Sequence, residues 1–557
     1  MRLDGKTEGL RQSMSWLHTW TGIVLGGLLY VIFFTGTLSY FQDEISLWMK
    51  PELHASVPAA TTERTAQVAL AGMATIAPNA TTWTLSLPTE RRTTVGASWR
   101  EPGQENSGRA GLKRAELDAA TGAQITPRET RGGGFLYRFH FELHSMPRAV
   151  SRWIVGIATM FMFVAIISGV ITHKKIFADF FTFRPRKGQR SWLDAHNASA
   201  VLALPFHIVI TFSGLLLLMS TLMPWAIEAA YQGDRQAYNA ERRGGGAQAE
   251  QRAERGPRGQ RGAGRGDAQP VDLAAAIGPM LAQARQQWPG REVGTITVNR
   301  PGKPNAIVEL REHGSESMVS RGASQRLRFD ATTGKQLASP PAQQPSTANA
   351  IFNVMVVAHL GDFAGPAVRW LLFLSGVMGT AMVGTGMVLW VVKRSPERRK
   401  LGYTPWGHHL VEKTNIAVIA GLALATAAYF WSNRLLPAEM AGRGGWEINA
   451  FFIAWLVSLL HAIVRPARAA WVEQCVAASL LFALLPLLNP LTGGHGLFTS
   501  LQLGQSAIVG FDLAMLALAA IFAAIPFHLL RKQRRAKVSN APAAPLSPVS
   551  TTSSVTP

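Results

Sequence analysis

Histidines recur at matching places in this chain of 557 residues. His18 and His196 are each followed, eighteen residues later, by a glycine at the end of an apolar run, Gly36 and Gly214. Imidazoles that face one another inside a helical bundle, with no carboxylate or cysteine in the same register, suit an iron porphyrin better than zinc or copper. The spacing therefore predicts that His18 and His196 hold one haem.

A second pair of histidines obeys the same repeat. His144 and His359 precede Gly169 and Gly386 by 25 and 27 residues, so a two-residue insertion separates the copies. Copies with the same orientation are related by an axis along the membrane normal, which places each pair face to face at one depth. We therefore predict two haems whose iron ligands are His18, His196, His144 and His359.

Two other histidines leave alternatives open. His140 lies one helical turn before His144, but Met355 occupies its place in the second copy. It is therefore an alternative ligand or an outer-surface contact. His207 follows His196 by eleven residues, which is about three turns of a helix. It either assists electron or proton passage at mid-membrane or makes a hydrogen-bonded contact between helices.

Two arginines stand beside tryptophans near the outer ends of predicted spans. They are Arg152, before Trp153, and Arg369, before Trp370. Guanidinium groups at these places could pair with haem propionates. Arg-Trp pairs equally suit anchoring in the aromatic belt of the membrane interface.

The chain is too apolar for an ordinary soluble domain, with 47% hydrophobic residues, 16% charged residues and a mean hydropathy of +0.10. Its clearest apolar runs reach the roughly 20 residues with which a helix crosses a bilayer. We predict a mainly α membrane protein of about eight spans, near residues 17–40, 150–172, 198–225, 368–392, 415–431, 449–464, 471–489 and 505–528.

The net charge of +21 raises the question of a nucleic-acid partner. Much of this charge lies in short segments between the spans, near 174–190, 393–400, 465–468 and 531–535. The positive-inside rule makes such segments cytoplasmic. We therefore expect no nucleic-acid partner, a lipid bilayer around the spans, both termini in the cytoplasm and two large outer loops. The only cysteine, Cys475, lies in a predicted span, which excludes thiolate metal sites.

The two outer loops also repeat one another. Asp118 and Asp330 each follow an alternating strand and begin the same Asp-Ala-x-Thr-Gly pattern, which is typical of a hairpin turn. Helical stretches at 66–76 and 273–288 precede these strands. Each loop is therefore predicted to be a small α+β domain, with one helix on a short antiparallel sheet.

These repeats define the domain organisation. The first copy covers 1–190, with an outer domain at about 60–130 between spans 17–40 and 150–172. The second copy covers 191–400, with an outer domain at about 270–340 between spans 198–225 and 368–392. A Gly/Arg/Gln-rich insert at about 232–269 and the tail at 538–557 are predicted to be disordered. Residues 401–537 show no repeat and are predicted to be an appended four-helix membrane unit.

The motifs resemble those of a known family. The resemblance rests on three motifs: Ser15-Trp16-Leu17-His18-Thr19-Trp20-Thr21-Gly22, the Asp-Ala-x-Thr-Gly turns and His359-Leu360-Gly361-Asp362-Phe363-Ala364-Gly365. Over about residues 10–395 they resemble the PepSY-associated transmembrane helix proteins, also called iron-regulated membrane proteins, which include ferric-siderophore reductases of the bacterial inner membrane. The resemblance implies PepSY-type periplasmic domains, two b-type haems and the four histidine ligands named above.

We therefore expect a transmembrane electron conduit that reduces a periplasmic ferric siderophore or other ferric chelate. No Gly-rich nucleotide fingerprint follows a strand, so a quinol or a separate cytoplasmic reductase is expected to supply the electrons. One alternative is a siderophore or iron transporter, because parallel repeats also suit alternating access. Another is a non-enzymatic sensor or assembly factor whose outer domains bind peptide.

Overall fold

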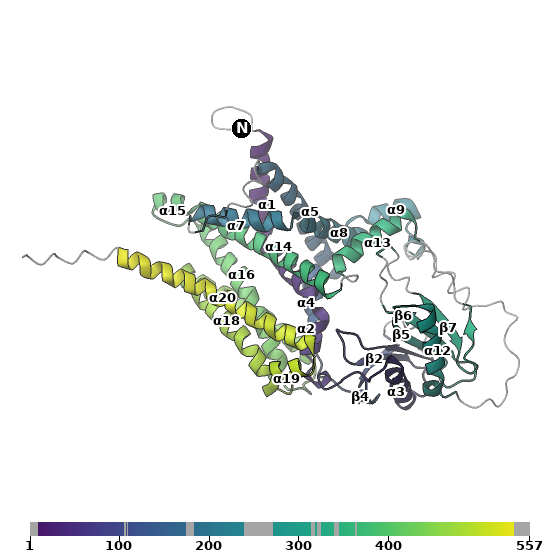
Figure 1. Cartoon of the computed structure of the whole chain (residues 1–557). Coiled ribbons are helices and arrows are strands. Elements are labelled where there is room, and N and C mark those ends of the chain that lie inside the picture. Colours follow the sequence, from purple (N-terminus) through teal and green to yellow (C-terminus); the bar gives the residue numbers. More distant parts are fainter. Residues whose placement is uncertain are drawn as a thin grey trace, which may run out of the picture.

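Eight membrane spans form the body of the molecule. The computed structural model describes residues 9–104, 107, 110–173, 183–185, 187–234, 236–238, 271–313, 318–319, 325–338, 345–361 and 365–539, with only the backbone of 532–539. Most of the predicted insert and tail lies outside these residues. Eight described helices are long and apolar enough to cross a membrane, which confirms the predicted number. They are α1 (Leu10–Ser39), α5 (Arg148–Thr172), α8 (Leu204–Leu222), α14 (Pro366–Lys393), α16 (Trp406–Leu435), α17 (Arg443–Val464), α18 (Ala467–Leu491) and α20 (Ser506–Ser539) (Figure 1).

The two ends of the bundle carry different elements. The start of α1 and the short helix α15 (Ser395–Leu401) lie at one end, and α2 (Gln42–Trp48), α19 (Leu497–Gln502) and the strands lie toward the other (Figure 1). We call the first end inner and the second outer, after the orientation predicted from the positive charges. Both long loops therefore leave the bundle on its outer side.

The third span begins later than predicted. Instead of one helix over 198–225, the chain forms α7 (Gln189–Leu202) and α8, with a break at Ala203. Pro205 in the first turn of α8 explains the break, because proline lacks the N–H that would continue the helix and its ring clashes with the carbonyl four residues earlier. His196 therefore lies on α7, which packs along α14.

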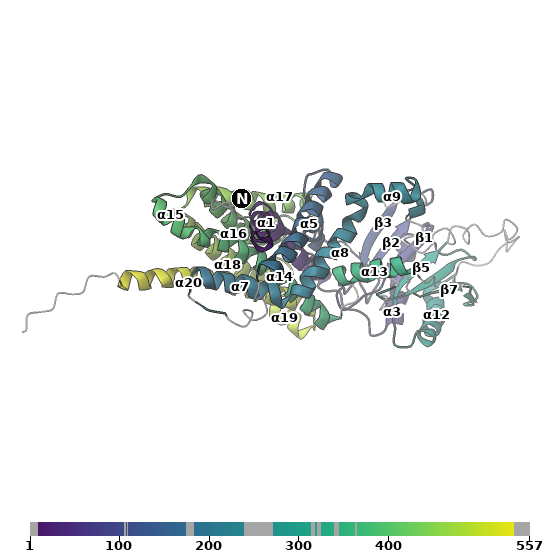
Figure 2. The ribbon, with the colours of Figure 1, turned by 90° about the horizontal axis from the view of Figure 1, so that it is seen from above.

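The outer strands form one sheet instead of the two separate sheets that the sequence suggested. Eight strands run in the order β4-β3-β2-β1-β5-β6-β7-β8, and β1 pairs antiparallel with β5, so the two copies join at the centre. The strands are β1 (Thr82–Ser86), β2 (Val95–Arg100), β3 (Leu112–Leu117), β4 (Gln124–Ile125), β5 (Val293–Asn299), β6 (Ile307–Glu312), β7 (Arg326–Asp330) and β8 (Gln336–Leu337). Helices α3 (Thr62–Ile76) and α12 (Leu273–Gln287) contact each other and cover one face (Figure 2).

The two predicted hairpin turns are confirmed and share their hydrogen bonds. Asp118 accepts from the backbone N–H and hydroxyl of Thr121 at 2.9 and 2.8 Å, between β3 and β4. Asp330 accepts from the same groups of Thr333 at 2.9 and 3.0 Å, between β7 and β8. A short acidic side chain that bonds its own backbone in this way stabilises a turn.

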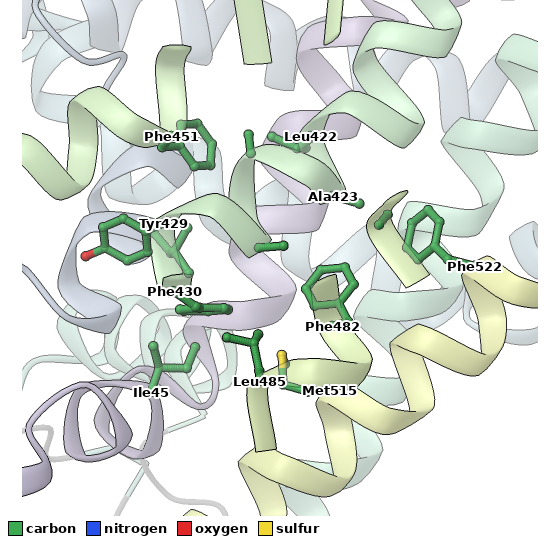
Figure 3. Close-up of a cluster of buried hydrophobic side chains, with 14 of the residues drawn as sticks. Ile45, Leu422, Ala423, Tyr429, Phe430, Phe451, Phe482, Leu485, Met515 and Phe522 are labelled. Carbon is green, nitrogen blue, oxygen red and sulfur yellow. The ribbon is translucent and has the colours of Figure 1, made fainter. Parts of the chain in front are cut away.

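The appended unit has its own apolar core and docks on the first copy. Aromatic and aliphatic side chains from α16, α17, α18 and α20 meet in one buried cluster (Figure 3). Phe135 of α4 (Gly133–Phe141) joins this cluster against Tyr429 and Phe451, with ring centres 5.1 and 5.2 Å away. Trp48 of α2 stacks on Phe511 at 4.3 Å. Burial of these aromatic rings holds α2 and α4 against the appended unit.

A buried charge network completes this interface. Arg443 and Glu447 are fully buried on α17 and bond at 2.5 Å. Glu447 also accepts from Asn433 at 2.7 Å and from Thr130, just before α4, at 2.6 Å. Arg443 donates to the backbone carbonyl of Glu129 at 3.0 Å. Because buried charges destabilise a fold unless they are paired and bonded, these contacts fix α4 on the appended unit.

Candidate functional site

The structure brings His18 of α1 together with His196 of α7. Their ring centres are 6.1 Å apart and their planes lie at 70°. Nδ1 of His18 is 2.9 Å from the carbonyl of Ala165, and Nδ1 of His196 is 2.8 Å from the carbonyl of Met382. Because a carbonyl only accepts, each Nδ1 carries a hydrogen, and Nε2 of a neutral ring keeps its lone pair. We call these two residues the inner pair.

An outer pair repeats this arrangement with different partners. His359 on α13 (Thr347–Leu360) lies beside His140 of α4, with ring centres 6.1 Å apart. Nδ1 of His140 is 2.7 Å from the carbonyl of Ile32. Nδ1 of His359 is 2.8 Å from the hydroxyl of Ser213, which itself donates to the carbonyl of Val209 at 2.6 Å. The ring of His359 therefore donates here, and both Nε2 atoms are again left for a ligand.

His144 does not enter the outer pair. It follows the end of α4 and stacks on Phe452 of the appended unit, with ring centres 5.2 Å apart and planes at 17°. Burial, together with the positive charge of Arg131, lowers its pKa. The place beside His359 that the sequence analysis gave to His144 is occupied by His140, because α4 ends at Phe141 and only His140 is carried on the helix that packs along α1.

Each of the four paired imidazoles rests against a glycine that follows a serine or threonine. The contacts are His140 on Thr35-Gly36, His18 on Ser168-Gly169, His359 on Ser213-Gly214 and His196 on Thr385-Gly386. A Cβ added at Gly36 would lie 2.6 Å from the ring of His140, and at the other three glycines 3.1–3.3 Å from a ring atom. The glycines that marked the repeat in the sequence are thus the surfaces that position the imidazoles.

A cavity of about 690 Å³ adjoins the inner pair. Both imidazoles line it, as do small residues such as Gly22, Gly169 and Ala200, which leave room for a flat ligand. Such a volume is typical of sites for small molecules and cofactors. The basic side chains along its wall are Arg11, Lys393 and Arg394.

The spacing of both pairs fits a metal centre between two imidazoles. A ring nitrogen binds a metal at about 2 Å, and each ring centre lies roughly 1 Å behind its nitrogen, so two opposed rings would have centres roughly 6 Å apart. Among the described residues, no group of three or more His, Cys, Asp or Glu is arranged to hold a metal ion. Two imidazoles with no further protein ligand would suit haem, because the porphyrin would supply the remaining iron ligands.

The remaining secondary candidates, His207, Arg152 and Arg369, lie outside the two pairs. His207 is fully buried at the cavity wall, and neither ring nitrogen has a hydrogen-bond partner among the described residues. Arg152 bonds Glu142 at 2.6 Å, and Arg369 bonds Glu44 at 3.4 Å. The two arginines thus form ion pairs at the outer ends of α5 and α14.

Contacts that the sequence does not predict link the sheet to the outer pair. Arg91, in the turn between β1 and β2, makes two bonds of 2.8 Å to Glu44 and one of 3.2 Å to the carbonyl of Tyr40. The hydroxyl of Tyr40 donates to the carbonyl of His359 at 3.4 Å. Because Arg369 bonds the same Glu44, the sheet, α14 and the outer pair are connected. No repeated motif marks these residues.

Comparison with known proteins identifies the family but not an activity. No curated protein matches the chain. The model of the PepSY-associated TM region matches residues 15–393, which include both histidine pairs, the outer sheet and the first four spans, but not the appended unit. This multi-pass membrane protein therefore belongs to the PepSY-associated TM region family.

Proposed function

We propose that this protein carries electrons across the bacterial inner membrane through two b-type haems and reduces a ferric siderophore or a similar ferric chelate on the periplasmic side. His18 and His196 would hold one haem, and His140 and His359 the other. The observation that carries the proposal is that two histidine pairs have the same ring spacing of 6.1 Å and the same seating on glycine.

The residues of the chain would prepare each site for its cofactor. Bonds from Nδ1 to Ala165, Met382, Ile32 and Ser213 fix the orientation of the rings, and such partners raise the basicity of the ligating nitrogen. The apolar helices keep water away. When bound, haem supplies reversible one-electron chemistry that the side chains alone lack.

The open face of the outer sheet supports an anionic, oxygen-rich acceptor. In the register of the strands, Thr84 and Thr297 stand side by side at the centre of this face, between Ser98 and Glu309. The charged residues that share the face are Arg100, Arg114, Arg311, Arg326, Arg328, Glu116, Glu309 and Asp330. Arginines outnumber carboxylates there, and guanidinium groups recognise carboxylate and related oxygen ligands.

The test is a reduced-minus-oxidised absorption spectrum of the purified full chain, with pyridine haemochrome quantitation. The expected result is two b-type haems per chain. His18→Ala or His196→Ala should remove one, and His359→Ala the other. The reduced protein should then be oxidised by a ferric siderophore. Protein that contains no haem after haem-replete expression would refute the proposal.

A further inference from the structure

The inner cavity extends beyond the family core to the appended unit. Residues of α16 line it together with α1 and α14, although α16 begins after the end of the family match. The α16 residues in the wall are Leu410, Val411, Thr414 and Asn415. The appended unit therefore completes one side of a cavity whose other side holds the inner pair. We call the part between α1, α14 and α16 the side branch.

The side branch borders a surface that the sequence predicts to face lipid. Gly22 of α1 and Leu410 of α16 both line the cavity and are both exposed. Around them, Trp20 and Val24 are 50% and 70% exposed. Large apolar side chains exposed on a spanning helix meet acyl chains. The side branch therefore lies beside the surface along which a ligand dissolved in the bilayer would travel.

Two polar ring atoms at the junction of α14 and α16 lack partners among the described residues, and one of the two rings, Trp390, lines the side branch. Trp390 of α14 lines the cavity, and its ring centre is 5.2 Å from that of His408 on α16, edge to face. Nε1 of Trp390 and Nδ1 of His408 are both buried, and neither has a hydrogen-bond partner among the described residues. Such atoms destabilise the fold unless a ligand or water satisfies them.

We infer that the side branch binds a membrane quinol, which is the electron donor of the function proposed above and on which this inference rests. A quinol combines a lipophilic tail with a ring that carries hydroxyl groups at opposite ends. Trp390 offers an N–H to a ring oxygen, and His408, which packs edge to face against Trp390, has a nitrogen that accepts a released proton. Arg394, whose guanidinium lies 3.9 Å from the centre of the Trp390 ring, keeps that ring in place.

Electrons and protons balance in the oxidation of the quinol. Oxidation of one quinol to the quinone releases two electrons and two protons. His18 and His196 would hold the haem that accepts these electrons, which would take up one electron at a time, two haem equivalents for each quinol. The protons leave through His408, which lies near the inner end of α16, where imidazole can exchange them with water. A separate reductase would instead need a docking surface at the inner end of the bundle.

The first experiment does not depend on haem. Purified full-length protein in lipid nanodiscs is photolabelled with an azidoquinone, and the labelled peptides are mapped by mass spectrometry. The expected label lies in the peptides that contain Trp390 and His408, and excess decylubiquinone should suppress it. Labelling elsewhere, or labelling that decylubiquinone does not suppress, would overturn the inference.

The second experiment follows anaerobic reduction by decylubiquinol, with dithionite as the reference. Trp390→Phe and His408→Ala should slow reduction of the haem by decylubiquinol at least tenfold. Reduction of the haem by dithionite and the haem spectrum should stay unchanged. The matched controls, Trp406→Phe and His409→Ala, alter exposed residues of α16, the helix that carries His408, and should behave as wild type. Equal rates in all four variants would refute the quinol site, whereas labelled protein without haem would refute only the proposed function.

Discussion

The inner and outer histidine pairs have the same ring spacing but different surroundings. The inner pair borders a cavity of about 690 Å³ with basic residues along its wall. In the outer pair, His140 is carried by α4, which the appended unit holds in place. Tyr40 bonds the backbone of the other member, His359. The two halves of the molecule therefore share paired imidazoles on glycine seats and differ in what lies around them. This difference is expected if one end receives electrons from a lipophilic donor and the other delivers them to a soluble acceptor.

The largest effect should separate His140 from His144. His140→Ala removes one ring of the outer pair, so we expect the loss of one of two haems. His144→Ala removes only a ring stacked on Phe452, which contributes about 0.5–1.5 kcal/mol, and should keep both haems. Haem quantitation of the two variants decides the matter. Loss of haem from His144→Ala alone would show that the sequence-based assignment of the ligand is right.

Breaking the network beneath α4 should damage the outer pair before the inner pair. Glu447→Ala leaves Arg443 buried without its charged partner, which destabilises a protein by about 3–5 kcal/mol. We expect a large drop in melting temperature and preferential loss of the outer haem. Arg443→Met combined with Glu447→Leu should recover much of the stability, because an apolar pair of similar volume needs no charged partner. An unchanged melting temperature in Glu447→Ala would contradict this account.

The glycine seats should differ in their tolerance of a methyl group. Alanine at position 36 would place its Cβ 2.6 Å from the His140 ring, and alanine at position 386 would lie 3.1 Å from the His196 ring. Gly36→Ala should therefore displace His140 and weaken or abolish the outer haem, whereas Gly386→Ala should mainly shift the spectrum or potential of the inner one. Redox titration of each variant measures this. Equal changes in haem content and potential in the two variants would contradict the prediction that position 36 tolerates a methyl group less well than position 386.

Acid should destabilise the outer end through His54. This residue is buried, its Nε2 is 3.0 Å from the carbonyl of Leu47, and its Nδ1 accepts the backbone N–H of His495 at 3.2 Å. Burial lowers its pKa from 6.5 to about 3, so between these values the unfolded chain binds more protons than the folded one. Stability is thus complete above pH 6.5 and falls below it, by at most about 1.4 kcal/mol per pH unit.

Melting temperatures in detergent at pH 7.5, 6.5 and 5.5 test this dependence. The outer haem should be lost before the inner haem as the pH falls. His54→Gln removes the titrating group and should flatten the slope between pH 6.5 and 5.5, although it lowers stability at neutral pH. A slope unchanged by the substitution would assign the pH dependence to other groups.

The smallest effect is expected from substitution of His207, which lies outside both histidine pairs. Its ring nitrogens lack partners among the described residues, and a buried polar group left in this state destabilises a fold by about 1–3 kcal/mol. His207→Phe should therefore raise the melting temperature slightly and keep both haems. Slower electron transfer between the haems in this variant, measured by flash photolysis, would instead give His207 a role in passage across the membrane.

Much of the fold could be predicted because it depends on local signals. Hydropathy indicated the eight spans, and the Asp-Ala-x-Thr-Gly pattern predicted both turns because their hydrogen bonds form within five residues. The pairing of β1 with β5 could not be predicted, since two complete loops had to be joined across the repeat axis. Neither could the contacts of the appended unit, because burial of Arg443 and Glu447 depends on a partner far away in the chain.

The sequence could not decide which histidine pairs with His359, because the spacing between histidines and arginines fits two alignments of the repeats. Arg369 follows His359 by ten residues, whereas Arg152 follows His144 by eight and His140 by twelve. Both alignments need a gap of two residues, so spacing alone could not choose between them. The end of α4 at Phe141 decides it. The glycines were recognised as landmarks, but their contact with the imidazoles required coordinates.

The continuous sheet also has a consequence for how the chain is made. β1 is synthesised more than two hundred residues before its partner β5. Until the second loop has crossed the membrane, the first outer domain presents an unpaired strand edge, which invites association with other chains. Biogenesis of this protein therefore includes an interval in which a half-built domain waits outside the membrane, and a chaperone that shields strand edges would act during that interval.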